Sequence, residues 1–144
     1  MVTIERLTKS SEEALEDINR LLPQLRSNPE EHKASLSELQ AITGDKNVAF
    51  IVARDADKIV GMATLYVITK FSKRNGHVED VVVDDAYRGQ GLGEKLMRAI
   101  IEVARVNGVK TLHLTSRPER VAGNKLYQKL GFEQKNTNAY LMKI

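Results

Sequence analysis

The stretch Arg88-Gly89-Gln90-Gly91-Leu92-Gly93 decides the fold of this 144-residue chain. It follows the run Val81-Val82-Val83, which is typical of a buried strand, and it opens a long amphipathic pattern. Glycines permit a positive φ, and the first N–H groups of a helix lack internal partners and attract anions. A strand, a glycine turn and a helix start therefore predict a phosphate or pyrophosphate site.

The helix after this loop has the clearest pattern in the chain. Apolar residues recur at spacings of three and four, which places them on one helical face. They are Leu92, Leu96, Ala99, Ile100, Val103 and Ala104. Gly108 follows Asn107, and a glycine at that place commonly ends a helix.

Two familiar phosphate-binding loops do not fit this stretch. A dinucleotide fingerprint requires its third glycine where Glu94 stands, and the following strand, 111–115, offers no acidic residue. The P-loop requires Gly-Lys-Ser/Thr, whereas Gly93 is followed by Glu94 and Lys95. The glycine loop therefore belongs to another class of anion site.

Composition predicts one globular domain over residues 1–144, with 42% apolar and 28% charged residues. No apolar run is long enough to cross a bilayer, so we expect no membrane partner. Cysteine is absent, which excludes a cysteine acyl-enzyme, and the three histidines lack metal-ligand spacing, so no metal is expected. The N-terminus lacks the features of a signal peptide, and a cytoplasmic location is the expectation.

Charge is distributed unevenly along the chain. Residues 88–144 carry 11 Lys/Arg and 4 Asp/Glu, whereas residues 1–87 carry 11 and 15. The basic half contains the glycine loop, which suits a polyanionic ligand, although chance and solubility offer a second explanation. Nucleic acid is not expected, because no helix-turn-helix or RNA-binding aromatic motif occurs and aromatic residues are only 5%.

The remaining pattern predicts a mixed α/β domain with the order β-α-α-β-β-β-α-β-α-β-β. Besides the helix from Leu92, helices are expected after Ser10 or Ser11, at 33–42 and at 119–129, with a loop around Pro29 at 26–32. Pro23 should end or kink the first helix, and Asn75-Gly76 should turn into the fourth strand. The expected strands are 2–7, 48–53, 59–68, 77–83, 110–115, 132–134 and 139–142.

This order, with the glycine loop after the fourth strand, resembles the GNAT superfamily of N-acetyltransferases. The coenzyme motif of that family is Gln or Arg, two residues, Gly, one residue, then Gly or Ala, and Arg88, Gly91 and Gly93 match it. A second family feature is an asparagine, a tyrosine and then Gly-Phe near the last helix, matched here by Asn124, Tyr127 and residues 131–132. The resemblance covers essentially the whole chain and implies the GNAT fold.

The resemblance implies acetyl-CoA as the donor and a primary amine of a small molecule or peptide as the acceptor. The pantetheine arm would pair with the fourth strand almost as an added strand, and a backbone N–H there would polarise the thioester carbonyl. Asn124 would contact the pantetheine or hold the last helix in place. The coenzyme contacts that we expect are Val81, Val82, Val83, Arg88, Gly89, Gln90, Gly91, Leu92, Gly93, Asn124 and Tyr127.

Two residues are the expected catalytic groups. By resemblance, Tyr127 donates a proton to the departing thiolate. Attack requires a neutral amine, and on a regular strand His77, Glu79 and Val81 share one face. Glu79 is the first candidate for the general base and His77 the second, with a water relay as the alternative. Asp80 faces the other way unless a β-bulge shifts the phase.

The acceptor is left open by the sequence. Residues 77–83 look like the fourth strand of eukaryotic glucosamine-6-phosphate N-acetyltransferases, whereas residues 115–120 do not look like their more acidic matching segment. A phosphorylated sugar would need cations, for which the candidates are Lys70, Lys73, Arg74 and Arg117. The acceptor is expected between residues 20–45 and the loops after the fourth and fifth strands.

Two further points stay open at the level of sequence. Members of the superfamily are often dimers, so a homodimer is one expectation, although the sequence shows no interface. A non-catalytic acyl-CoA-binding regulatory module on the same fold is the alternative to an enzyme.

Overall fold

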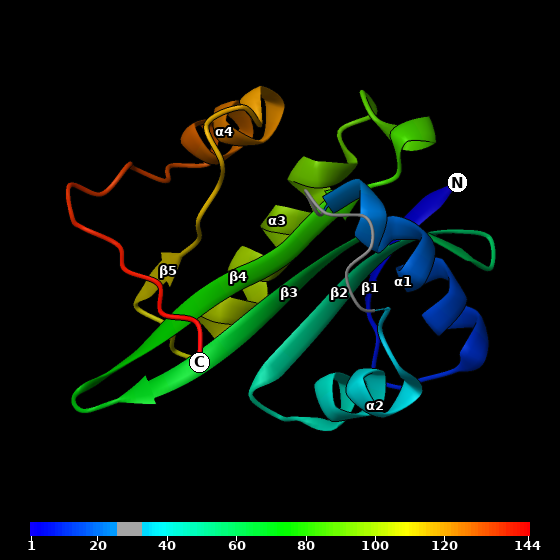
Figure 1. Cartoon of the computed structure of the whole chain (residues 1–144), viewed down its shortest axis with the longest axis horizontal. Helices are drawn as coiled ribbons and strands as arrows, with labels where there is room; N and C mark the ends of the chain where they lie inside the picture. Colours follow the sequence, from blue (N-terminus) through cyan, green and yellow to red (C-terminus); the bar gives the residue numbers. More distant parts are fainter. Residues whose placement is uncertain (26–32) are drawn as a thin grey trace.

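The computed structural model describes residues 1–25 and 33–144, so the loop expected around Pro29, at 26–32, lies outside the described residues. The order of elements is given in Figure 1 and reads β1 (Val2–Arg6), α1 (Glu12–Leu25), α2 (Leu36–Gly44), β2 (Val48–Asp55), β3 (Lys58–Lys70), β4 (Lys73–Val83), a 3-10 turn (Asp85–Tyr87), α3 (Leu92–Val106), β5 (Thr111–His113) and α4 (Val121–Lys129).

The strands form a five-stranded sheet in the order β1-β2-β3-β4-β5. Neighbours from β1 to β4 pair antiparallel, whereas β5 pairs parallel with β4 through only three residue pairs. A parallel neighbour requires a crossover, and α3 provides it on one face of the sheet. The sheet thus has long antiparallel strands in its centre and a short parallel strand at one edge.

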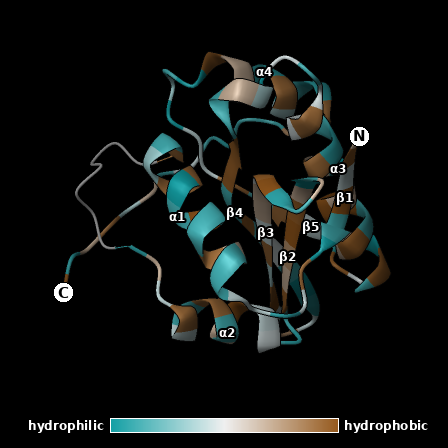
Figure 2. Ribbon diagram, turned by 90° about the vertical axis from the view of Figure 1, so that its right-hand side faces the viewer, coloured by the Kyte–Doolittle hydropathy of each residue, from teal (hydrophilic) through white to brown (hydrophobic). Residues whose placement is uncertain are grey.

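Each face of the sheet buries its own apolar cluster. Leu92, Leu96, Met97 and Ile100 of α3 pack on one face, and all four are at most 3% exposed. On the other face, α1 and α2 cover a second cluster that includes Leu21 at 0% exposure. Figure 2 shows the hydrophobic strands between α1 and α3. The amphipathic pattern that begins at Leu92 is therefore confirmed as the core-facing side of α3.

Within the described parts of the chain, no helix is both long and apolar enough to cross a membrane.

The last two expected strands, at 132–134 and 139–142, are wrong, because residues 132–144 form no regular secondary structure. A strand must pair with a neighbour to satisfy its backbone groups, and the nearest edge strand, β5, is only three residues long. Phe132 packs against the core, but the apolar side chains at the end of this segment are exposed: Tyr140, Leu141, Met142 and Ile144 are 82–118% exposed.

The turn expected at Asn75-Gly76 is also wrong, because Gly76 lies inside β4. The hairpin turns instead at Phe71-Ser72, where Ser72 has a φ of 68°. A Cβ added to Gly76 would lie 2.6 Å from Leu112 Cδ2, so this glycine permits a close approach between β4 and β5.

Helix boundaries also differ from the expectations. The first helix ends at Leu25, two residues beyond Pro23. The second begins at Leu36 rather than at residue 33, because Ser35 and Glu38 form a capping box there. The last helix begins at Val121 rather than at 119.

A partly buried ion pair fixes α1 to the end of β4. The guanidinium of Arg20 binds the carboxylate of Asp84 and donates to the carbonyl of Ile59 at 2.7 Å. Asp84 is 7% exposed and also accepts from the N–H of Ala86 at 3.1 Å. Burial alone would raise the pKa of Asp84, but the hydrogen bonds from Ala86 and Arg20 outweigh it and leave this pKa below its usual value.

We predict that Arg20→Met lowers the free energy of unfolding by about 3 kcal/mol at pH 7, because it leaves the Asp84 carboxylate buried without its cation. The lowered pKa of Asp84 contributes stability above the carboxyl pKa of the unfolded chain, about 3.9, and this contribution is lost as the pH falls through the folded value. The difference between the two proteins should therefore shrink below pH 4. Urea denaturation at pH 7 and at pH 3 measures both effects; an equal difference at both would contradict this explanation.

Candidate active site

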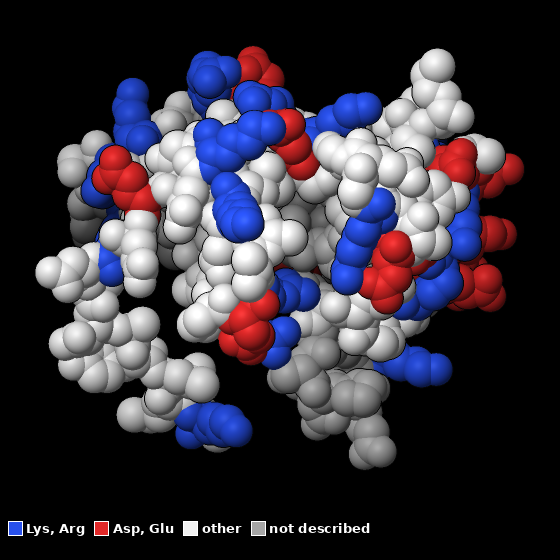
Figure 3. Space-filling model, turned by 90° about the horizontal axis from the view of Figure 1, so that it is seen from above, with Lys and Arg blue, Asp and Glu red and all other residues white. Residues whose placement is uncertain are grey.

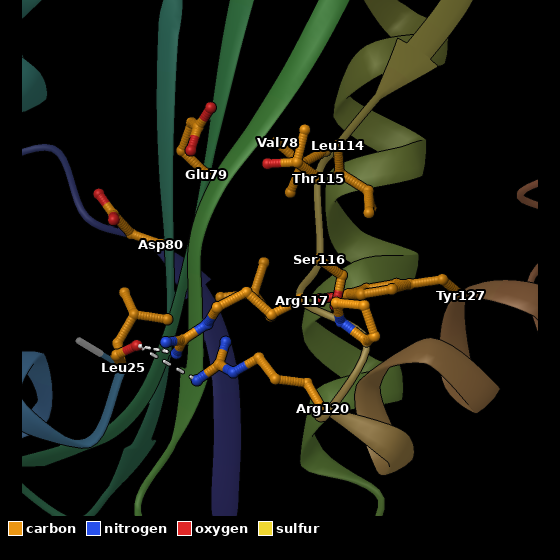
Figure 4. Close-up of a pocket in the computed structure, with 12 residues that line it drawn as sticks. Leu25, Val78, Glu79, Asp80, Leu114, Thr115, Ser116, Arg117, Arg120 and Tyr127 are labelled. Carbon is orange, nitrogen blue, oxygen red and sulfur yellow. Dashed lines mark hydrogen bonds between the residues drawn. The ribbon is translucent and has the colours of Figure 1, made fainter. Parts of the chain in front are cut away.

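A cleft opens where β4 and β5 separate. Their pairing ends at His77 and His113, and beyond this point a cavity of about 580 Å³ lies between the two chain segments. Figure 4 shows residues 78–80 of β4 along this cavity and residues 114–116, which follow β5, on its other side; Val81 also lines it. Among residues 1–25 and 33–144, no strand pairs with the cleft-facing edge of β4 beyond His77, so an extended ligand can pair with it.

A β-bulge at Asp80 changes the phase of β4. Thr64 lies opposite Glu79 and Met62 opposite Val82, so Ala63 faces two residues of β4. Asp80 has a φ of 54°. Such a bulge reverses which face the following side chains occupy and leaves a residue outside the regular ladder.

The expectation that His77, Glu79 and Val81 share one face is therefore wrong. Val81 and Val83 pack against the cluster under α3, whereas Val82 is buried in the cluster under α1. A bulge was the one circumstance in which Asp80 was expected to change face, and β4 contains that bulge.

The bulge also brings two carboxylates to one side of the cleft. Figure 4 shows that the side chains of Glu79 and Asp80 project from the same side of β4, and both residues line the cavity. Their charge reaches the neighbouring strand: burial raises the pKa of the Tyr66 hydroxyl most, and the charges of Asp80 and Glu79 raise it further. The carboxylates of Glu79 and Asp80 can attract an ammonium and accept its proton.

His77, the second candidate base, lies beside the cleft rather than in it. Its ring stacks on that of His113 with the ring centres 5.2 Å apart. It lines a neighbouring hollow of about 540 Å³ together with Tyr66 and Glu79. Glu79 is thus the candidate base that borders both spaces.

Tyr127 of α4 lines the cleft opposite the two carboxylates. Its ring meets Phe132 edge-on with the centres 5.9 Å apart, which fixes its orientation. Burial raises the pKa of its hydroxyl, although the charge of Arg120 opposes this. The phenol therefore carries its proton at neutral pH and can donate it.

Asn124 holds the loop between β5 and α4. Its side-chain amide donates to the carbonyl of Arg117 at 3.0 Å. Of the two roles that the sequence left open, this geometry matches the one in which Asn124 holds the end of α4 in place. Its contact with the coenzyme stays a prediction.

The glycine loop joins the 3-10 turn to α3 in the geometry expected for an anion cradle. Gly89 and Gly91 have φ values of 79° and 76°, and Gly91 is the N-cap of α3. A Cβ added to either would meet no atom within 4 Å, so open space lies over both residues. No side chain caps α3, and the N–H groups of its first turn are available to a ligand.

Arg88 turns back onto its own loop. Its guanidinium pairs with Asp85 at 2.6 Å and donates to the carbonyl of Val83 at 3.2 Å. Asp85 offsets much of the charge of Arg88, so the backbone N–H groups of the loop would contribute more than Arg88 to the binding of an anion. Figure 3 views this end of the molecule and shows Lys and Arg side chains around the hollow in its middle.

The four candidate cations separate in the structure. Lys70, Lys73 and Arg74 lie at the β3–β4 hairpin, where Arg74 donates to the carbonyl of Asn107 at 2.8 Å. Arg117 lines the cleft, and so does Arg120, which the sequence analysis missed. The sequence feature that could have indicated Arg120 is its position just before α4, in the basic half of the chain.

Among residues 1–25 and 33–144, no three His, Asp or Glu side chains gather in a way that could hold a metal ion. The groups that line the cleft are carboxylates, a phenol, guanidinium groups and the backbone of β4.

Comparison with known proteins identifies the family of this chain. The acetyltransferase (GNAT) family matches residues 12–132. A relative from rice, glucosamine 6-phosphate N-acetyltransferase 1, is 39% identical over 124 residues, which cover 83% of this chain and 72% of that protein.

Two solved structures share the fold. An acetyltransferase from Trypanosoma brucei superposes with a TM-score of 0.80 and 28% identity, covering 99% of this chain and 100% of that one. Glucosamine-6-phosphate N-acetyltransferase from Arabidopsis thaliana gives a TM-score of 0.78 at 22% identity, covering 99% and 97%. The chain belongs to the GNAT family of acetyltransferases and is an N-acetyltransferase.

We predict that Gly91→Val lowers the affinity for acetyl-CoA at least about tenfold, while the protein stays folded. The left-handed conformation disfavours a β-branched residue, and the new side chain fills the space above the loop. Calorimetric titration with acetyl-CoA measures the affinity. Gly44→Val is the matched control, because Gly44 also has open space around it but no positive φ. An unchanged affinity in Gly91→Val would remove the loop from the coenzyme site.

Tyr127→Phe is expected to reduce kcat roughly 100-fold and to leave the affinity for acetyl-CoA nearly unchanged, because it removes a proton donor but keeps the packed ring. Release of free thiol measures kcat. Tyr87→Phe, which removes a hydroxyl that donates to Asp55 outside the cleft, provides the control. Full activity in Tyr127→Phe would mean that another group protonates the thiolate.

Proposed function

We propose that this enzyme transfers the acetyl group of acetyl-CoA directly to the primary amine of glucosamine 6-phosphate. The single observation that carries the proposal is the cleft between β4 and β5, which has carboxylates on one side and a protonated tyrosine and two arginines on the other. The 39% identity to the rice glucosamine 6-phosphate enzyme supports this choice of acceptor.

The glycine loop, the start of α3 and the edge of β4 fit the binding of acetyl-CoA, the acetyl donor. The N–H groups at the start of α3 and the open space over Gly89 and Gly91 would hold the pyrophosphate. The unpaired edge of β4 beyond His77 would hold the pantetheine arm. An N–H at the bulge, which lies outside the regular ladder, would stabilise the negative charge that develops on the carbonyl oxygen.

The residues of the cleft would then move two protons. Glu79 accepts one from the bound ammonium, directly or through water, and the neutral nitrogen forms its bond to the acetyl carbon. As the carbon–sulfur bond breaks, Tyr127 donates its proton to the sulfur and regains one from the nitrogen, which carries a proton too many after the attack. The chain has no cysteine, so this route needs no acyl-enzyme.

We also propose that the enzyme acts as a homodimer. Tyr140, Leu141, Met142 and Ile144 lie at the C-terminus with 82–118% of their surface exposed. Such a cluster of apolar side chains gains stability when a second surface covers it. Light scattering of the full chain and of a chain ending at Thr137 tests this: only the full chain should be a dimer.

An amine panel tests the proposed acceptor. Purified enzyme with acetyl-CoA is given glucosamine 6-phosphate, glucosamine, a polyamine and a peptide amine, and the release of free thiol is followed. Glucosamine 6-phosphate should give the largest kcat/KM. A preference for another amine would overturn the acceptor, and coenzyme binding without turnover of any amine would favour the non-catalytic alternative.

Glu79→Gln is expected to remove the low-pH limb of the kcat/KM profile, because the amide cannot accept a proton. The rate should fall roughly 100-fold at neutral pH. Asp80→Asn is the matched comparison at the adjacent carboxylate. If the profile changes in Asp80→Asn and not in Glu79→Gln, then Asp80 is the base; if it changes in neither, a water relay or His77 takes that role.

A further inference from the structure

Two arginines of the β5–α4 loop meet at one backbone carbonyl across the cleft. The guanidinium of Arg117 donates to the carbonyl oxygen of Leu25 at 3.2 Å, and that of Arg120 approaches the same oxygen at 3.5 Å. Leu25 is the last residue of α1. Figure 4 shows both side chains reaching past β4 to this oxygen, and all three residues line the cavity.

Within the described part of the chain, this arrangement holds two like charges together with a single counter-charge beside them. The only carboxylate within 4.0 Å of the Arg117 guanidinium among residues 1–25 and 33–144 is that of Glu119, at 3.8 Å and on an exposed side chain. Over residues 1–25 and 33–144, no carboxylate lies within 4.0 Å of the Arg120 guanidinium. A single neutral carbonyl uses few of the ten N–H donors of the two groups. The remaining donors suit an anion that accepts several hydrogen bonds.

The backbone that carries the two arginines is fixed. The N–H of Arg120 donates to the carbonyl of Arg117 at 3.1 Å, and the N–H of Asn124 donates to the carbonyl of Arg120 at 3.0 Å. The side chain of Asn124 also donates to the carbonyl of Arg117. The two guanidinium groups can therefore turn from the carbonyl of Leu25 to a ligand while the loop keeps its place.

The charges of the cleft are separated in a way that suits a ligand with two opposite charges. Glu79 and Asp80 lie on β4, and the guanidinium groups of Arg117 and Arg120 gather at the end of α1 (Figure 4). An acceptor whose ammonium meets the carboxylates can place an anionic group at the arginines. Phosphate matches a pair of guanidinium groups well, because each can form two parallel hydrogen bonds with it.

We propose that Arg117 and Arg120 bind the phosphate of the acceptor and select phosphorylated amines over neutral ones. The inference rests on the proposed acetyl transfer and adds the residues that recognise the acceptor. A charge-assisted hydrogen bond that is lost from such a site reduces binding about 10- to 100-fold. The KM for an acceptor without phosphate should stay unchanged.

The experiment compares the wild-type enzyme with Arg117→Gln, Arg120→Gln and the corresponding Lys variants. Each is given glucosamine 6-phosphate or glucosamine with saturating acetyl-CoA. We expect each Gln variant to raise KM for glucosamine 6-phosphate about 10- to 100-fold and to leave KM for glucosamine and KM for acetyl-CoA unchanged, whereas kcat can change with both sugars because the charge of Arg120 acts on Tyr127. The Lys variants should recover part of the loss. Arg105→Gln, on the exposed side of α3, is the matched control.

Inhibition by inorganic phosphate gives a second readout. In the wild type, phosphate should compete with the acceptor and not with acetyl-CoA, and both Gln and Lys variants should need more phosphate for half inhibition. If the Gln variant at one of the two positions does not fold, phosphate inhibition of the Lys variant at that position tests the inference. A larger effect on KM for acetyl-CoA would overturn the inference and assign the pair to the coenzyme.

The two proposals fail in different ways. Equal losses with glucosamine and glucosamine 6-phosphate overturn the role of the arginines and leave the acetyl transfer intact. A wild-type enzyme that acetylates neither sugar overturns the proposed acceptor. Competition by phosphate against whichever amine the panel finds then supports or refutes the arginine pair.

Discussion

The active site depends on the separation of two parallel strands. β4 and β5 share only three residue pairs, and where this pairing ends the edge of β4 exposes backbone groups that need partners. Side chains of both strands, Val78 and Val81 of β4 and Leu112 of β5, pack against the apolar cluster that α3 helps to form, so one core supports both strands. The unsatisfied edge is then a binding surface for an extended ligand.

Contacts around the cleft keep its two sides at a fixed distance. Lys129 of α4 pairs with Glu94 of α3 at 2.9 Å, and the side chain of Leu126 packs over Gly93. On the other side, Arg20 and Asp84 join α1 to the end of β4. The glycine loop lies between these two anchors. Its geometry therefore depends on α1, α3 and α4 together, although its own residues set its conformation.

The sequence predicted the glycine loop and the helix after it, because both depend on neighbouring residues. The glycines at 89 and 91 require positive φ wherever they fold, and the apolar spacing after Leu92 defines the helix that follows. The acceptor side was harder to predict. Asp80 enters the cleft through a bulge that depends on pairing with β3, and Arg120 approaches Leu25 across 95 positions of sequence. The strands expected at 132–134 and 139–142 were wrong for the same reason, since a strand forms only beside a neighbouring strand.

The sequence by itself determined the fold class, the glycine loop and the helix that follows it, because backbone freedom and hydrophobic spacing act over a few residues. The tertiary structure alone decided which side chains share the cleft. The phase of β4, the exclusion of His77 from the cavity and the meeting of Arg117 with Arg120 at Leu25 all follow from contacts between distant segments. Such contacts set the geometry of catalysis, and no local pattern encodes them.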